Sequence, residues 1–154
     1  MRLRVVSRWG WVAVGSRRKS REMAMQMLFQ GDLGKQKPAE VESLFWGSRD
    51  DVDDETRGFA DDLHRLATRR DEEIDELIQK HAQNWRLERM PVVDRNLLRA
   101  GIAEMLGFPS TPTAVVINET LEIARRYAAP ESIHFLNGVL DAIGRELLAK
   151  RLSR

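Results

Sequence analysis

Apolar residues recur at the spacing of an α-helix along most of the chain. In "SREMAMQMLFQ", residues Met23, Ala24, Met27 and Leu28 follow one another at i, i+1, i+4 and i+5, which predicts one core-facing helical stripe. A serine at position 16 or 20 is expected to cap this first helix. The polar run "GDLGKQKP" then breaks the pattern.

Two further helical segments are expected before residue 84. Pro38 is placed to open a short second helix that continues through Trp46. The loop "GSRDDVDDE" puts acidic residues before the third helix, where the helix dipole favours them. The stripe of this third segment bends near Arg70–Asp71, and it contains Phe59, Leu63, Leu66, Ile74, Leu77 and Ile78.

Three more apolar runs follow Pro91, which ends the segment "HAQNWRLERMP". Thr111 and Pro112 are expected to be the N-cap and first residue of the middle run. Asn137–Gly138 is a hairpin signal in isolation, but it lies inside a helical stripe, so we expect a helix with close backbone approach at Gly138. The stripes contain Leu97, Leu98, Gly101, Ile102, Met105 and Leu106, then Ile117, Leu121, Ala124 and Ala128, then Ile133, Leu136, Val139, Leu140, Ile143 and Leu147.

The pattern therefore predicts an all-α bundle of six or seven helices in a single domain covering residues 16–154. Residues 1–15, "MRLRVVSRWGWVAVG", match neither a transmembrane helix nor a signal peptide. They are interpreted as a disordered extension or a wrongly assigned start.

Composition disfavours an enzyme. The chain has no cysteine, which removes thiolate metal sites and cysteine nucleophiles and fits a reducing cytoplasm. Its three histidines, His64, His81 and His134, are scattered without metal-ligand spacing. We expect no catalytic residue, no metal and no cofactor.

Charge is strongly segregated along the chain. Residues 1–39 carry nine Lys or Arg against two carboxylates, whereas residues 40–76 carry fourteen carboxylates against five Arg. Arg17, Arg18, Lys19 and Arg21 crowd the start of the first helix, where exposed backbone N–H groups add donors for phosphate. This predicts a polyanion site. Reading single-stranded RNA also requires aromatic faces and polar edges, for which the candidates are Phe29, Phe135, Gln26, Glu131, Ser132 and Asn137.

Four motifs, in this order and spacing, resemble the bacterial NusB family of transcription antitermination factors: "RRKSREMAMQMLFQ", "PVVDRNLLRAGIAEML", "VVINETLEIARRYA" and "SIHFLNGVLD". The resemblance covers roughly residues 16–148. It implies two small packed helical subdomains, at about 16–84 and 85–150, without catalytic activity. It also implies binding of boxA single-stranded RNA together with NusE, a small-subunit ribosomal protein. The pair then joins RNA polymerase and other Nus factors, notably on ribosomal RNA operons.

The resemblance assigns roles to particular positions. The family's arginine-rich helix start falls on Arg17, Arg18, Lys19 and Arg21, and its RNA-touching loop falls on Glu131, Ser132 and Phe135. Phe29 and Asp94 correspond to positions that face NusE. Phe29 stands where many relatives carry Tyr, and Pro130–Glu131 replaces a commoner acidic pair.

Two alternatives remain open from the sequence. A similar helical bundle forms an accessory domain in some RNA-modifying enzymes. The chain could also be a self-associating helical protein, in which a homodimer hides the RNA surface.

Overall fold

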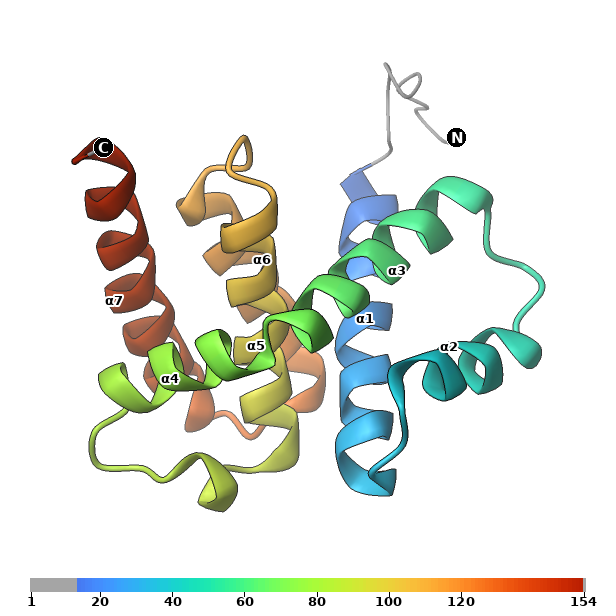
Figure 1. Ribbon diagram of the computed structural model, residues 1–154, viewed down its shortest axis with the longest axis horizontal. Coiled ribbons are helices and arrows are strands. Elements are labelled where there is room, and N and C mark those ends of the chain that lie inside the picture. The colour runs from blue at the N-terminus through green and yellow to red at the C-terminus, as the bar shows by residue number, and fades with distance from the viewer. Residues whose placement is uncertain (1–13, 154) are drawn as a thin grey trace.

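The computed structural model describes residues 14–153, which form seven α-helices and one short 3-10 helix, with no strand among them (Figure 1). This confirms the predicted all-α class. The elements are α1 (Val14–Gly34), α2 (Pro38–Gly47), α3 (Asp54–Arg69), α4 (Asp71–His81), η1 (Leu87–Arg89), α5 (Val92–Gly107), α6 (Thr113–Tyr127) and α7 (Ser132–Leu152). No helix in this range is long and apolar enough to span a membrane.

The first helix begins earlier than the sequence pattern suggested. Because α1 starts at Val14, positions 16 and 20 lie inside it, and the prediction that one of these serines is the N-cap is wrong. The Ser20 hydroxyl instead donates to the backbone carbonyl of Thr56, 2.8 Å away, joining α1 to α3. The predicted extension at residues 1–15 lies outside the described residues except for its last two positions, which are helical.

The predicted bend near Arg70–Asp71 is confirmed. Arg70 ends α3 and precedes α4, with a φ of −110° and a ψ of 28° that interrupt the helix. The acidic start of α3 also behaves as expected, since the Asp53 carboxylate accepts a hydrogen bond from the Thr56 backbone N–H at 2.8 Å.

Two local expectations in the C-terminal half are corrected. Helix α6 begins at Thr113 with Pro112 as its N-cap, so the predicted cap at Thr111 is misplaced by one residue. Gly138 lies in α7, as predicted, but it is exposed and has no neighbour within 4 Å of where a Cβ would lie. Close approaches occur instead at Gly101, where an added Cβ would lie 3.1 Å from Thr120 Oγ1, and at Gly107, where it would lie closer still to Leu66 Cδ2.

The largest core cluster joins α4, α5, α6 and α7 to one side of α1. The buried Ile74 and Ile78 of α4 share this cluster with Leu98, Ile102 and Leu140. A smaller cluster packs α2 against the other side of α1. The predicted subdomain boundary near residue 84 remains a prediction, although the side chains of α4 pack with the helices that follow it.

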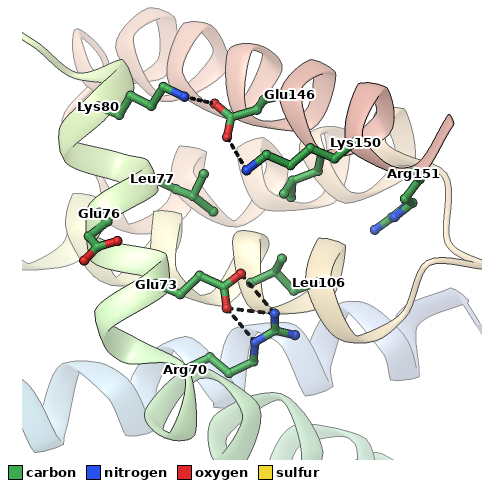
Figure 2. Close-up of a pocket in the computed structure, with 10 residues that line it drawn as sticks. Arg70, Glu73, Glu76, Leu77, Lys80, Leu106, Glu146, Lys150 and Arg151 are labelled. Atoms are coloured by element: carbon green, nitrogen blue, oxygen red, sulfur yellow. Dashed lines mark hydrogen bonds and ion pairs between the residues drawn. The ribbon is translucent and has the colours of Figure 1, made fainter. Parts of the chain in front are cut away.

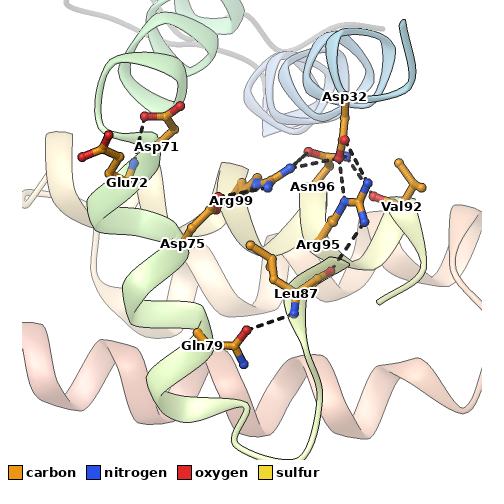
Figure 3. Close-up of polar contacts among 10 residues, drawn as sticks. All are labelled: Asp32, Asp71, Glu72, Asp75, Gln79, Leu87, Val92, Arg95, Asn96 and Arg99. Atoms are coloured by element: carbon orange, nitrogen blue, oxygen red, sulfur yellow. Dashed lines mark hydrogen bonds and ion pairs between the residues drawn. The ribbon is translucent and has the colours of Figure 1, made fainter. Parts of the chain in front are cut away.

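A polar network fixes the C-terminal part of α1 to α5 (Figure 3). The Asp32 carboxylate accepts from Arg95 at 2.7 and 2.8 Å and from Arg99 at 2.9 Å. Arg99 also pairs with Asp75 of α4 at 2.9 Å. Burial of Asp32 opposes ionisation, but the hydrogen bonds from Arg95 and Asn96 hold the pKa of this carboxyl below its usual value.

Candidate nucleic-acid interface

The predicted basic run lies about one turn inside α1, which begins at Val14, so the expectation that it sits at a helix start with free backbone N–H donors is wrong beyond Arg17. The four side chains also have different surroundings. Lys19 is exposed and has no ion pair within residues 14–153. Arg17 is also exposed, and its guanidinium carbon lies 4.0 Å from the centroid of the Phe59 ring. This cation–π contact orients Arg17 while leaving its charge unneutralised.

Arg18 is partly exposed, and its guanidinium is paired with a carboxylate of the same chain. Its guanidinium donates two hydrogen bonds to Glu119 of α6, with N–O distances of 3.1 and 2.7 Å. These bonds raise the pKa of Arg18. Since 43% of the Arg18 side chain remains exposed, a phosphate can reach it by sharing or displacing Glu119.

Arg21 points into the protein instead of toward solvent. It donates two hydrogen bonds of 2.7 Å to Glu104 of α5 and lies 3.4 Å from Glu119. The side chains of Arg21 and Glu104 are only 11% and 1% exposed. The structure therefore gives Arg21 a role in joining α1 to α5, and its predicted contact with RNA remains a prediction.

A seam of polar contacts between α1 and α6 continues from the basic run. Arg126 donates to Glu22 at 3.1 Å, and the Tyr127 hydroxyl donates to the same carboxylate. Gln26, a predicted RNA-binding residue, donates to the Tyr127 oxygen at 3.1 Å. Burial and the nearby Glu22 raise the pKa of Tyr127, so its hydroxyl stays protonated.

The seam leads to the start of α7, where the other predicted RNA-binding residues lie. Glu131 is exposed immediately before the helix. The Asp94 side chain is buried, and this burial raises the pKa of its carboxyl although the Ser132 hydroxyl opposes the rise. Phe135 is half-buried and packs against the main core. The predicted partner residue Phe29 is half-buried against the same core.

Three residues at this surface were missed by sequence reasoning. Glu119 and Tyr127 meet α1 only because the fold brings α6 alongside it, so no local signal identifies them. Trp85 could have been recognised, because the segment "NWRLER" places an aromatic residue among arginines outside any apolar stripe. It is 51% exposed, and its ring centroid lies 6.1 Å from that of Phe135.

A separate groove of about 520 Å³ lies between α4 and α7 (Figure 2). Its leucines include Leu77 and Leu106, and Glu146 lies at its edge. The Glu146 carboxylate binds Lys80 at 2.8 Å, His81 at 2.8 Å and Lys150 at 2.9 Å. Hydrogen bonds from these three groups lower the pKa of Glu146 to about 2. Residues 14–153 contain no group of three or more His, Asp or Glu arranged to hold a metal ion.

Comparison with known proteins gives concordant matches. The NusB family model matches residues 18–145. Transcription antitermination protein NusB of Koribacter versatilis (strain Ellin345) is 59% identical over 140 residues, which are 91% of this chain and 96% of that protein. The protein of the same name from Desulforapulum autotrophicum is 42% identical over 84% of this chain and 92% of its own.

Solved structures match as well. A Thermotoga maritima NusB structure ("T. maritima NusB") has a TM-score of 0.77 and 34% identity, covering 84% of this chain and 91% of that chain. A crystal structure of the antitermination factors NusB and NusE in complex with dsRNA has a TM-score of 0.79 and 29% identity, covering 86% of this chain and 98% of that chain.

Proposed function

Because this chain belongs to the NusB family, we propose that it is a transcription antitermination factor that binds boxA-type RNA together with NusE. It acts by binding and not as an enzyme. With other Nus factors it modifies elongating RNA polymerase in the cytoplasm, notably on ribosomal RNA operons. Its similarity to proteins named for antitermination, over nearly their whole length, favours this role over an accessory domain of an RNA-modifying enzyme.

The observation that carries this proposal is a continuous surface strip. It starts at the basic run of α1, follows the seam of polar contacts between α1 and α6, and ends at the start of α7. Arg18 contacts α6 at Glu119, Glu22 contacts the end of α6 at Arg126, and Gln26 contacts Tyr127. Only a short turn then separates Tyr127 from Glu131 and Ser132. An extended RNA strand can follow this strip, with phosphates at the basic end and bases at the α7 end.

The charges along the strip also explain why a second protein is needed. Arg17 and Lys19 are free to meet phosphates, whereas Arg18 and Arg126 are each shared with a glutamate. Since phosphate contacts supply most sequence-independent affinity, a strip that is partly neutralised binds RNA weakly alone. NusE adds contact area, and Phe29 and Asp94 are the proposed positions for it.

Asp94 lies where the RNA and NusE surfaces meet. Its carboxyl is buried, and the hydroxyl of Ser132, a proposed RNA-binding residue, influences its pKa. A NusE contact at the start of α5 would therefore lie beside the start of α7. This gives NusE a direct structural route to the RNA-binding residues.

The test is a titration of labelled boxA RNA at several salt concentrations, with and without NusE. We expect boxA to bind at least tenfold more tightly than a scrambled strand when NusE is present. Single-stranded and double-stranded forms are compared, because the related complex contains dsRNA. Equal affinity for boxA and scrambled RNA in the presence of NusE would contradict the proposal.

A matched pair of variants localises the phosphate site. Arg17→Ala/Arg18→Ala should weaken binding of every RNA and flatten the dependence on salt. Lys35→Ala/Lys37→Ala removes the same amount of charge just beyond the other end of α1. The rise per residue of a helix puts these lysines roughly 25 Å from Arg17 and Arg18. This variant should bind RNA with an affinity within about twofold of wild type. That change is well below the loss of affinity expected when a phosphate contact is removed.

A further inference from the structure

Trp85 lies in the loop between α4 and η1, and half of its side chain is exposed to solvent. Tryptophan has the largest aromatic face of any side chain, and leaving it in water is unfavourable unless something covers it. Among the described residues, its ring has an edge contact with Phe135 and about half of its surface stays open to solvent.

The backbone around Trp85 is held in place. The Gln79 side chain donates to the Trp85 carbonyl at 2.8 Å and accepts from the Leu87 backbone N–H at 3.0 Å, the latter visible in Figure 3. The Trp85 backbone N–H donates to the Ala82 carbonyl at 3.0 Å. Gln79 of α4 therefore holds the loop at Trp85 and at Leu87, and the Ala82 carbonyl holds it before the tryptophan, so the exposed ring is presented from a hydrogen-bonded backbone.

Two arginines, Arg86 and Arg89, follow Trp85 closely in the chain. Arg86 is 73% exposed and makes only a long contact of 3.8 Å with Glu88. Arg89 is exposed and has no ion pair within residues 14–153. An aromatic face beside free guanidinium groups is the combination that holds single-stranded nucleic acid, because bases stack on the ring while phosphates meet the cations.

We propose that Trp85 stacks on an unpaired base of the bound RNA, and that Arg86 and Arg89 contact the phosphates on either side of that base. This inference rests on the proposed function and extends its RNA strip past Phe135 onto the loop after α4. Together, Trp85 and Phe135 form an aromatic corner made by two segments that lie far apart in the sequence.

An RNA base fits this corner better than a protein partner does. A protein that covered Trp85 would also have to bury Arg86 or pair it with a carboxylate. The acidic side chain that contacts Arg86, Glu88, is exposed and lies 3.8 Å from it. RNA supplies the required negative charge and an aromatic surface in the same molecule.

The experiment measures boxA affinity of the full chain with NusE for wild type, Trp85→Ala and Trp85→Phe. We expect Trp85→Ala to bind about tenfold more weakly, equivalent to about 1.4 kcal/mol, and Trp85→Phe to recover most of that loss. Leu44→Ala is the control, because Leu44 on α2 is a comparably exposed apolar side chain. Thermal unfolding of each variant verifies that the fold is intact.

An abasic scan of the RNA identifies the stacked base. Removing that one base should weaken wild-type binding about tenfold and Trp85→Ala binding by less than twofold, since the stacking partner is already absent. If Trp85→Ala binds boxA within twofold of wild type, this inference is overturned while the proposed function stands. An equal loss of NusE binding without RNA would assign Trp85 to the protein partner and also overturn it. If the wild-type protein with NusE does not prefer boxA, both the proposed function and the inference about Trp85 are overturned.

Discussion

The Arg21 guanidinium holds the Glu104 carboxylate through two hydrogen bonds of 2.7 Å, and both side chains are almost completely buried. A run of four cations in the sequence thus divides in the structure. Arg17, Arg18 and Lys19 reach the surface, and Arg21 fastens α1 to α5. A charge that looks like part of a ligand site in the sequence instead stabilises the helix that presents the site.

Arg21→Met should strongly destabilise the protein. The substitution leaves Glu104 buried without its partner, and such unpaired buried charges cost about 3–5 kcal/mol. Urea unfolding measures the change in the free energy of unfolding. Arg21→Met/Glu104→Met removes both charges and should recover a large part of the loss; a double variant as unstable as the single one would show that the pair is not the cause.

Glu119→Gln should strengthen RNA binding. Removing the carboxylate frees Arg18 from its present partner, which should raise affinity by about two- to fivefold, given that partly exposed ion pairs contribute up to about 1 kcal/mol. The dependence on salt should also steepen. Asp141→Asn is the control, because it removes the same charge from an exposed pair with Arg145 on α7. Equal effects of the two variants would point to net charge instead of the Arg18 contact.

Glu146 should make the protein sensitive to acid. Its pKa is lowered from 4.5 to about 2 in the folded protein, so the unfolded chain takes up the proton first as pH falls. The stability contributed by Glu146 is therefore complete above pH 4.5 and is lost as pH approaches 2. Glu146→Gln should lower the free energy of unfolding at neutral pH by about 1 kcal/mol, and this difference should vanish near the folded pKa.

Urea unfolding from pH 2 to pH 7 measures the effect of Glu146. Asp141→Asn is the matched control, because Asp141 forms an exposed pair with Arg145 on the same helix. Its difference from wild type should be small throughout. A difference for Glu146→Gln that stays constant across this range would contradict the assignment.

Two glycine substitutions should have opposite effects on stability. Gly138 lies inside α7 with open space where a Cβ would lie, so Gly138→Ala should stabilise the protein by about 0.5–1 kcal/mol. Gly101→Ala should destabilise it by about 1–3 kcal/mol, because the added methyl group would press on Thr120 and Leu140. Chemical unfolding tests both, and stabilisation by Gly101→Ala would mean that α5 and α6 can separate slightly.

The helices were predictable from the sequence because their apolar stripes are long and regular. The bend at Arg70 could be seen because acidic residues restart a helix directly after it. The errors fall at caps and glycines. Ser20 has the residue type of a cap but bonds to Thr56 across the fold, and Gly138 gave no sign of whether a neighbour approaches it. These outcomes depend on tertiary packing, and the spacing of residues along the chain gives no information about it.

The candidate site was only partly predictable for the same reason. The basic run is a local feature and was evident in the sequence. The glutamates that share its cations were not, because Glu104 and Glu119 lie far from α1 in the chain and on other helices. Charge counts along a sequence therefore show where cations occur but not which of them are available to a ligand.

Helix α1 is fastened to α5 at two places, by Arg21 to Glu104 near one end and by Asp32 to Arg95 near the other. With both ends secured, α1 can neither slide along α5 nor roll on the core without breaking charged contacts. The proposed RNA-binding residues of α1 consequently keep their position relative to α5 in the free protein. Capture of a transcript then requires little rearrangement, and its speed depends on diffusion and long-range attraction.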